Sequence, residues 1–246
     1  MKTLQDKVVL VSGATSGIGQ EIARLFAAEG AALVLAGRRS TEGNALAAEL
    51  TARDAQVVFQ TADVTRAADQ AALVELAVSR FGRLDIAVNN AGIEAAGPLS
   101  GFDEATYERV FDTNVRAVFL ALRAQVPELT KTKGSILVTG SIAGIRGMPG
   151  ASVYAASKHA VEGIVKSAAL ELAPLGVRVN AVSPGPIATQ MLDRFTGGHP
   201  DVMAAQVPLG RLGTPEEIAQ AALWLVSPAA AYTSGTILRI DGGMSA

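Results

Sequence analysis

The sequence predicts an α/β fold, a doubly wound parallel sheet with helices on both faces. Short apolar runs of the kind that form buried strands alternate along the chain with longer segments of helical periodicity. Strands that alternate with helices form parallel sheets with right-handed crossovers. The chain has 246 residues, of which 49% are hydrophobic and 18% charged, and it shows no repeat, linker or charge run. We therefore expect one domain over residues 1–246.

The first strand is expected at residues 7–12, and a glycine-rich loop follows it at once. A helix from residue 20 to 29 then places Ile22 and Phe26 on one apolar face and ends at Gly30. Glycines between a strand and a helix let the backbone approach a pyrophosphate, which then sits over the helix N-terminus. The spacing differs from the common dinucleotide fingerprint, and a turn that only needs positive φ is the alternative. The loop residues expected to bind phosphate are Gly13, Thr15, Ser16, Gly17, Ile18 and Gly19.

The second strand, at residues 32–36, leads into Gly37-Arg38-Arg39. At this point of a dinucleotide site an acid binds the ribose 2′-hydroxyl, or an arginine accepts a 2′-phosphate. Gly37 stands in the acid's place, and a planar guanidinium suits a phosphate. The pattern therefore favours NADP over NAD, with solvated arginines as the alternative.

A helix at about 41–52, a strand at 56–61, a helix at 66–81 and a strand at 84–88 are expected next. Asp63 and Val64 follow the first of these strands, where the carboxylate could bind an adenine amino group or serve a turn. The segment after the second strand, Asn89-Asn90-Ala91-Gly92, could bring backbone close to a ligand.

A long helix is expected from about Asp103 until Pro127 stops it, and it contains Asn114, an amide that needs partners if it is buried. The next strand is expected at 134–141 and ends at Ser141. A helix reaching Leu172 then carries Tyr154 and Lys158 one turn apart on one face.

These last two side chains predict acid/base chemistry. A free phenol has a pKa of about 10, and a cation within about 4–6 Å would lower it. Tyr154 beside Lys158 would thus be a general acid/base poised nearer neutral pH. Ser141 could hold a carbonyl oxygen. Alternatively, both residues simply lie on the surface of an amphipathic helix.

A strand at 176–182 leaves through the rigid turn 183–189. No element is assigned to residues 190–213, and long irregular segments are often lids; we expect a substrate lid at about 187–213. Thr214-Pro-Glu-Glu217 begins a helix, and a last strand covers 235–240. Because ligands bind at the carboxyl ends of parallel strands, the polar residues after these strands should meet in one crevice.

The combined motifs resemble short-chain dehydrogenases/reductases of the classical type over essentially the whole length. They are Gly13-x3-Gly17-x-Gly19, Asn89-Asn-Ala-Gly92, Asn114, Ser141, Tyr154-x3-Lys158 and Pro184-Gly185 with Thr189. Ser12 departs from the family's usual threonine but keeps a hydroxyl. The resemblance implies a single-domain Rossmann fold with a seven-stranded sheet, an NADP(H)-dependent oxidoreductase acting on a ketone or aldehyde, and a homotetramer.

The resemblance also implies residue roles. Tyr154 would exchange a proton with the substrate, Lys158 would lower its pKa and hold the nicotinamide ribose, and Ser141 would orient the carbonyl. Asn114 would hold a relay water. Ile187 and Thr189 would grip the carboxamide, beside Pro184 and Gly185. The expected substrate pocket is mostly apolar and comprises Glu94, Ile142, Met148, Met191, Leu192 and Phe195; Glu94 either selects a polar group or points into water.

Two alternative functions stay open at this stage. A 3-oxoacyl-(acyl-carrier-protein) reductase would need a basic patch, to which Lys131 and Lys133 could contribute. A non-catalytic NADP-binding sensor is the other, since fold does not fix function.

The composition of the chain argues against several classes of function. The net charge of −2 gives no electrostatic footprint for nucleic acid or a membrane. The chain has no cysteine and two histidines, so we expect no metal site. No stretch reads as a signal peptide or membrane span, and we expect a cytoplasmic protein.

Overall fold

A parallel sheet of seven strands forms the centre of the molecule in the computed structural model, which describes residues 2–246. The strand order is β3-β2-β1-β4-β5-β6-β7. The strands are β1 (Val8–Ser12), β2 (Ala32–Gly37), β3 (Val57–Thr61), β4 (Ile86–Asn89), β5 (Ser135–Thr139), β6 (Arg178–Pro184) and β7 (Ile237–Ile240). The predicted α/β class, the seven strands and their parallel direction are confirmed.

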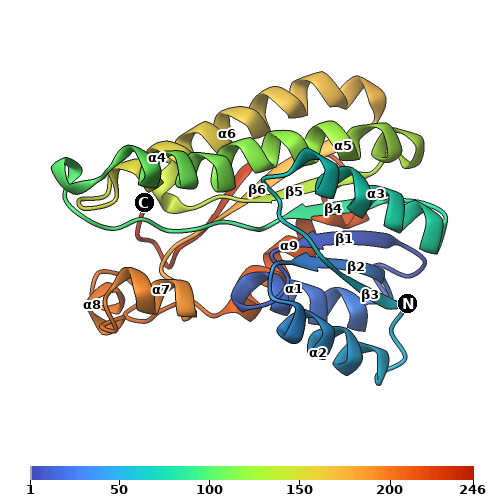
Figure 1. Cartoon of the computed structure of the whole chain (residues 1–246), viewed down its shortest axis with the longest axis horizontal. Helices are drawn as coiled ribbons and strands as arrows, with labels where there is room; N and C mark the ends of the chain where they lie inside the picture. Colours follow the sequence, from blue (N-terminus) through green and yellow to red (C-terminus); the bar gives the residue numbers. More distant parts are fainter. Residues whose placement is uncertain (1) are drawn as a thin grey trace.

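Helices cover both faces of this sheet (Figure 1). One face carries α1 (Gly17–Ala28), α2 (Ser40–Thr51) and α9 (Pro215–Val226). The other carries α3 (Ala67–Phe81), α5 (Ala117–Thr132) and α6 (Ser152–Leu172), with α4 (Glu104–Phe111) roughly in line with α5 at its left end in Figure 1. Two short helices, α7 (Gln190–Phe195) and α8 (Asp201–Ala204), occupy the segment that the sequence left unassigned.

Two apolar layers hold these helices on the sheet. Phe26 of α1 and Leu50 of α2 belong to one layer, and Leu129 of α5 and Val165 of α6 to the other. Strand residues alternate between the layers, so that Val9 and Val11 of β1 face one and Leu10 faces the other. A sheet covered on both faces explains why its strands read as continuous apolar runs.

The helix around Asn114 departs from the prediction in two ways. It is not one regular helix, because a π-helical turn, η2 (Asp112–Arg116), joins α4 to α5. The predicted stop at Pro127 is also wrong, since α5 runs through that proline to Thr132 and the chain turns at Lys133, whose φ is 51°. Proline removes one helical hydrogen bond, but the following turn is anchored by Leu129, which is fully buried.

The remaining boundaries differ by a few residues. Ser141 lies two residues beyond β5, at the start of the short 3₁₀ turn η3 (Ile142–Gly144). The predicted cap at Thr214 is a full capping box with Glu217. No helix within residues 2–246 has both the length and the apolar character required to cross a bilayer.

Candidate active site

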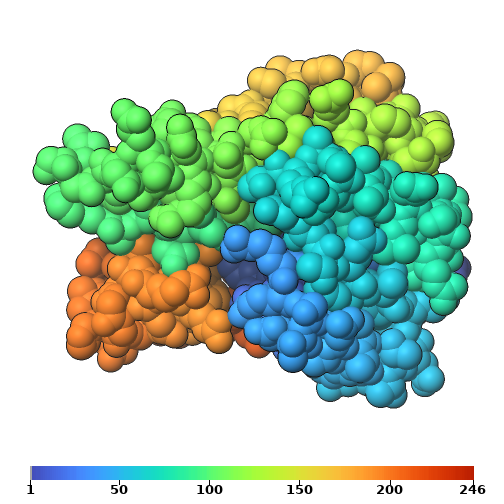
Figure 2. Space-filling model, in the orientation of Figure 1, coloured from blue at the N-terminus to red at the C-terminus, as the bar shows by residue number. Residues whose placement is uncertain are grey.

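A cavity of about 690 Å³ opens at the carboxyl ends of the strands. In the space-filling view the molecule is hollowed between the orange segment of α7 and α8, the green segment around α4 and the blue N-terminal residues (Figure 2). Nearly all residues that the sequence singled out line this cavity. Among the residues predicted to take part in catalysis or in cofactor or substrate binding, Gly19 and Asn114 do not line it.

The glycine loop between β1 and α1 is shaped by close backbone packing. Gly13 and Gly17 have φ of 67° and 54°, which favours glycine at both positions. A Cβ at Gly13 would lie 2.8 Å from the backbone of Ala91, and one at Gly19 would lie 2.3 Å from the Gly13 carbonyl oxygen. The start of α1 therefore packs closely against the loop after β1, and Ser16, Gly17 and Ile18 line the cavity there. The first turn of α1 contains no acidic residue that would repel an anion.

The two arginines after β2 differ in their contacts. Arg39 donates from Nε and Nη2 to Thr15 Oγ1 at 3.2 and 3.1 Å, and its Nη1 lies 3.7 Å from Glu42. Arg38 lines the same part of the cavity, and no side-chain hydrogen bond or ion pair holds it among residues 2–246. Arg39 thus braces the glycine loop, while the Arg38 guanidinium stays available.

Asp63 serves a turn as well as the cavity wall. Its Oδ1 accepts hydrogen bonds from the Thr65 backbone N–H and hydroxyl, at 3.0 and 2.8 Å. These bonds stabilise the carboxylate and lower the pKa of Asp63. The turn role weighed at the sequence level is therefore present, and the residue still faces the cavity beside Val64.

A chain of hydrogen bonds links the glycine loop to Lys158. Asn90 Nδ2 donates to the Gly13 carbonyl at 3.1 Å, and Asn90 Oδ1 accepts from Thr139 Oγ1 at 3.0 Å. Lys158 Nζ donates to the Thr139 carbonyl at 2.9 Å. Thr139 is a residue that the sequence reading missed, although its place at the tip of β5 could have suggested it. These bonds fix the loop and the ammonium group relative to each other.

Asn114 holds the loop after β4 against α6. Its Oδ1 accepts from the Ile93 N–H at 2.8 Å, and its Nδ2 donates to the Ile93 carbonyl at 2.9 Å and to Ser157 Oγ at 3.0 Å. Asn114 is 1% exposed and lies within the π-helical turn η2. Inserted turns of this kind are frequent at functional sites.

Ser141, Tyr154 and Lys158 face the cavity together. Ser141 Oγ accepts from the Ala143 N–H at 3.1 Å, which sets the direction of its hydroxyl. Lys158 Nζ lies 5.7 Å from the centre of the Tyr154 ring. A hydroxyl, a phenol and an ammonium group thus converge on the space next to the glycine loop.

The expected lowering of the Tyr154 pKa is not found in the protein by itself. Burial raises the pKa of the phenol, a hydrogen bond with Ser141 opposes that shift, and the charge of Glu94 adds to it. Burial also lowers the pKa of Lys158, to about 8. Desolvation penalises both charged forms, and the nearby ammonium does not offset this penalty for the phenol.

Glu94 does not point freely into water. Arg194 of α7 donates from Nε and Nη2 to its two carboxylate oxygens, at 2.6 and 3.2 Å. Both residues line the cavity, as do Arg109, Thr113, Gln190 and Met203, which the sequence reading also missed. No sequence pattern could have found Arg194 or Met203, because they belong to short helices without an apolar period.

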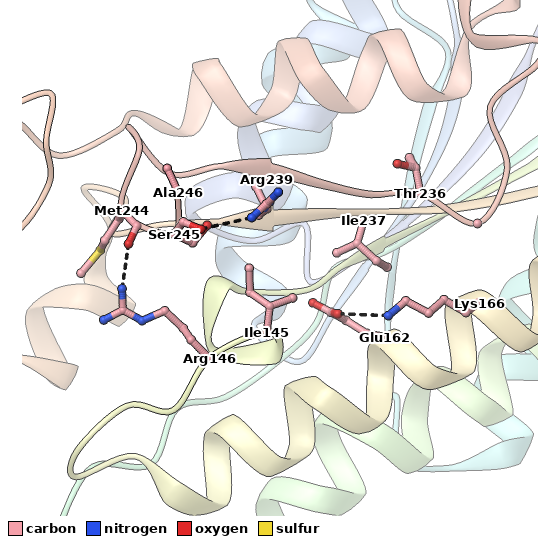
Figure 3. Close-up of a pocket in the computed structure, with 11 residues that line it drawn as sticks. Ile145, Arg146, Glu162, Lys166, Thr236, Ile237, Arg239, Met244, Ser245 and Ala246 are labelled. Carbon is pink, nitrogen blue, oxygen red and sulfur yellow. Dashed lines mark hydrogen bonds and ion pairs between the residues drawn. The ribbon is translucent and has the colours of Figure 1, made fainter.

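A second cavity, of about 760 Å³, lies between β7, α6 and the C-terminal residues (Figure 3). Arg146 and Arg239 donate to the backbone carbonyls of Met244 and Ser245 there. Lys166 lies 3.8 Å from Glu162. This larger cavity contains neither the glycine loop nor the catalytic candidates, so the smaller one is the candidate active site.

Comparison with known proteins places the chain in a family. Residues 13–245 match a family model described as Enoyl-(Acyl carrier protein) reductase. The chain is 40% identical to an A-factor type gamma-butyrolactone 1′-reductase (1S-forming) of Streptomyces virginiae, over 98% of this chain and 96% of the relative. It is 40% identical to the 3-oxoacyl-(acyl-carrier-protein) reductase FabG of Thermotoga maritima, over 98% of both chains.

A third relative is a cyclopentanol dehydrogenase of a Comamonas species, 39% identical over the full length of both chains. All three relatives are named as reductases or dehydrogenases, which supports oxidoreductase activity and implies a nicotinamide cofactor. These matches cover almost every residue of the fold described above. The chain belongs to the short-chain dehydrogenase/reductase family.

Proposed function

We propose that the protein is an NADP(H)-dependent oxidoreductase that interconverts a ketone or aldehyde with an alcohol, with Tyr154 as general acid/base. One observation carries the proposal. Ser141, Tyr154 and Lys158 line the same cavity as the glycine loop, at the carboxyl edge of the sheet. Carbonyl reduction needs a proton donor within reach of the substrate oxygen and next to a hydride source, and this arrangement offers that site.

The cavity wall suits a dinucleotide. Its glycine loop brings bare backbone to the start of α1, where a pyrophosphate is favoured. Lys158 and Tyr154 would hold the nicotinamide end, together with Pro184, Gly185, Ile187 and Thr189, which line the same cavity. Bound there, the cofactor supplies or accepts the hydride.

The chain's own residues handle the proton. Ser141 would hold the carbonyl oxygen by a hydrogen bond, so that Tyr154 can protonate this oxygen as negative charge develops on it. Lys158 would stabilise the phenolate that remains, and the phenolate would regain its proton from solvent through Lys158, a relay water and Asn114. Positioned proton transfer of this kind contributes about 10²- to 10⁴-fold in rate.

The preference for NADP is supported by the residues after β2. No acid stands at the end of the strand, where Gly37 occupies the position that would read a 2′-hydroxyl. The Arg38 guanidinium lines the cavity next to it. A 2′-phosphate would satisfy both the charge and the planar donor geometry of an arginine.

The expected substrate is a hydrophobic carbonyl compound. Five of the six residues predicted to line the pocket are apolar, namely Ile142, Met148, Met191, Leu192 and Phe195. The Comamonas relative is named for a cyclic alcohol. Cyclopentanone and related ketones are therefore the first candidates.

A second candidate is the 3-oxoacyl-(acyl-carrier-protein) reductase activity named for the Thermotoga maritima relative. The proposed carrier patch receives no support, because Lys131 pairs with Glu128 at 2.7 Å and lies at the end of α5, before β5 begins. That end is opposite the cavity. The other alternative, a non-catalytic NADP-binding sensor, would give Tyr154 no role as a proton donor.

The test is a screen of NADPH oxidation against cyclic ketones, aldehydes, sugars and 3-oxoacyl thioesters. We expect turnover with at least one cyclic ketone. Turnover restricted to 3-oxoacyl thioesters would favour the second candidate. Tight NADPH binding with no turnover across the panel would favour the sensor.

We also propose a single domain whose residues 187–213 act as a substrate lid, a homotetramer, and a cytoplasmic location. Phe119 of α5 and Leu170 of α6 are 55% and 80% exposed, which supports contact between subunits on that face. Sedimentation at several concentrations should give about four times the chain mass of 25.2 kDa. A concentration-independent monomer would contradict this part.

A further inference from the structure

An ion pair joins the two sides of the candidate active site. Glu94 follows β4 in the chain, and Arg194 belongs to α7, one hundred residues later. The contact is bidentate and uses both carboxylate oxygens. The Glu94 side chain is 16% exposed and that of Arg194 is 59% exposed, so the carboxylate is the inner member of the pair.

The pair lies near the proposed proton donor. Glu94, Arg194 and Tyr154 line the same cavity, and the charge of Glu94 contributes to the raised pKa of Tyr154. Apolar side chains, among them those of Ile142, Met191 and Phe195, line the cavity together with this pair. A substrate that reaches Tyr154 therefore shares the cavity with this charged pair.

The charges of the Glu94–Arg194 pair decide which substrates can bind in the cavity. A bidentate carboxylate occupies the donor fork of the arginine that a carboxylate substrate would need. The same carboxylate repels an incoming anion, whereas a neutral substrate meets a pair that has no net charge. A carboxylate substrate would have to displace Glu94, whereas an uncharged ketone would meet a satisfied pair.

We propose that the Glu94–Arg194 pair restricts the site to uncharged carbonyl compounds, and that Arg194 is the group that accepts a carboxylate substrate once Glu94 no longer holds it. This inference rests on the proposed carbonyl reduction. It assigns a specificity role to two residues that form no hydrogen bond with the glycine loop, Tyr154 or Lys158 within residues 2–246.

Two ketones that differ by a single charge provide the test. Cyclopentanone and 3-oxocyclopentanecarboxylate have the same ring, and the ratio of their kcat/KM values cancels general losses of activity. Wild-type protein should prefer cyclopentanone. Glu94→Gln keeps the size of the side chain but removes its charge, and should move the ratio by about tenfold or more toward the carboxylate.

Two further variants identify the arginine involved. Glu94→Gln combined with Arg194→Gln should lose the gained preference, whereas Glu94→Gln combined with Arg109→Gln should keep it. Arg109 is the matched control, because it lines the same cavity from α4. Arg194→Gln alone leaves Glu94 without its partner and should move the ratio further toward cyclopentanone.

Distinct results would overturn the inference. An unchanged ratio in Glu94→Gln, with wild-type turnover of cyclopentanone intact, would refute the specificity role and leave carbonyl reduction standing. The shift of the kcat/KM ratio in Glu94→Gln could also survive the added Arg194→Gln change and disappear with Arg109→Gln. That result would show that Arg109 accepts the carboxylate, and it would overturn the role given to Arg194. Absence of turnover by the wild type with any ketone would overturn the proposed function and this inference together.

Discussion

Lys158 Nζ lies 5.7 Å from the centre of the Tyr154 ring and donates its hydrogen bond to the Thr139 carbonyl at 2.9 Å. The ammonium group is therefore held by the backbone of β5 and not by the phenol. Lys158 is 6% exposed, and burial lowers its pKa to about 8. This placement keeps a buried cation next to the proposed proton donor.

The lowered pKa of Lys158 predicts a dependence of stability on pH. Between pH 8 and 10.5 the unfolded chain binds a proton at Lys158 that the folded protein has released, so the free energy of unfolding rises with pH through this window. Below pH 8 the full penalty of the buried charge remains. Lys158→Met removes the penalty, and its stability advantage over wild type should shrink by on the order of 2 kcal/mol between pH 7 and pH 10.

Urea unfolding of both proteins across this range measures the effect. Lys131→Met, at an exposed lysine, is the matched control for loss of a lysine. Curves for wild type and Lys158→Met that run parallel from pH 7 to pH 10 would show that burial does not shift this group.

Asn114 should matter for stability as well as for turnover. Asn114→Leu keeps the size of the side chain but leaves the Ile93 N–H and carbonyl without their partners. We expect a loss of about 2–4 kcal/mol in the free energy of unfolding, measured by urea denaturation. Ser157→Ala removes one of the three hydrogen bonds of Asn114 and should cost about 1 kcal/mol. Equal losses from the two variants would contradict the bracing role of Asn114.

The two arginines after β2 should separate in cofactor titrations. Arg38→Asp should weaken NADPH binding by at least about tenfold and affect NADH little, because only NADPH carries the phosphate. Arg39→Asp should weaken both cofactors to a similar degree, since Arg39 braces Thr15 in the glycine loop. Fluorescence titration with each cofactor decides this, and an equal loss of both cofactors in Arg38→Asp would show that Arg38 does not read the phosphate.

The sequence predicted the sheet well because the inner strands, such as β1 and β4, are buried and are followed directly by a polar or glycine segment. The sequence did not predict the π turn at Asn114. The hydrogen bonds of Asn114 are made with Ile93 and Ser157, which are distant from it in the sequence. The effect of Pro127 was misjudged because local propensity says nothing about the packing of Leu129.

Most residues of the candidate site were predicted from the polar and glycine residues that follow the strands in the sequence. Thr139 was missed because its role depends on Asn90 and Lys158 from other elements. The Glu94–Arg194 contact was missed because the two residues are one hundred positions apart. Arg194 also belongs to helix α7, which has only six residues. The direction of the Tyr154 pKa shift was also misjudged, because spacing along a helix does not reveal how much protein surrounds a phenol.

The most direct test of the account is the turnover of Tyr154→Phe with NADPH and a ketone that the wild type reduces. The phenylalanine keeps the ring and removes only the hydroxyl, so NADPH binding measured by fluorescence should stay nearly intact. We predict that kcat falls by about 10²- to 10⁴-fold. Near-normal turnover by this variant would show that the phenol of Tyr154 is not the proton donor.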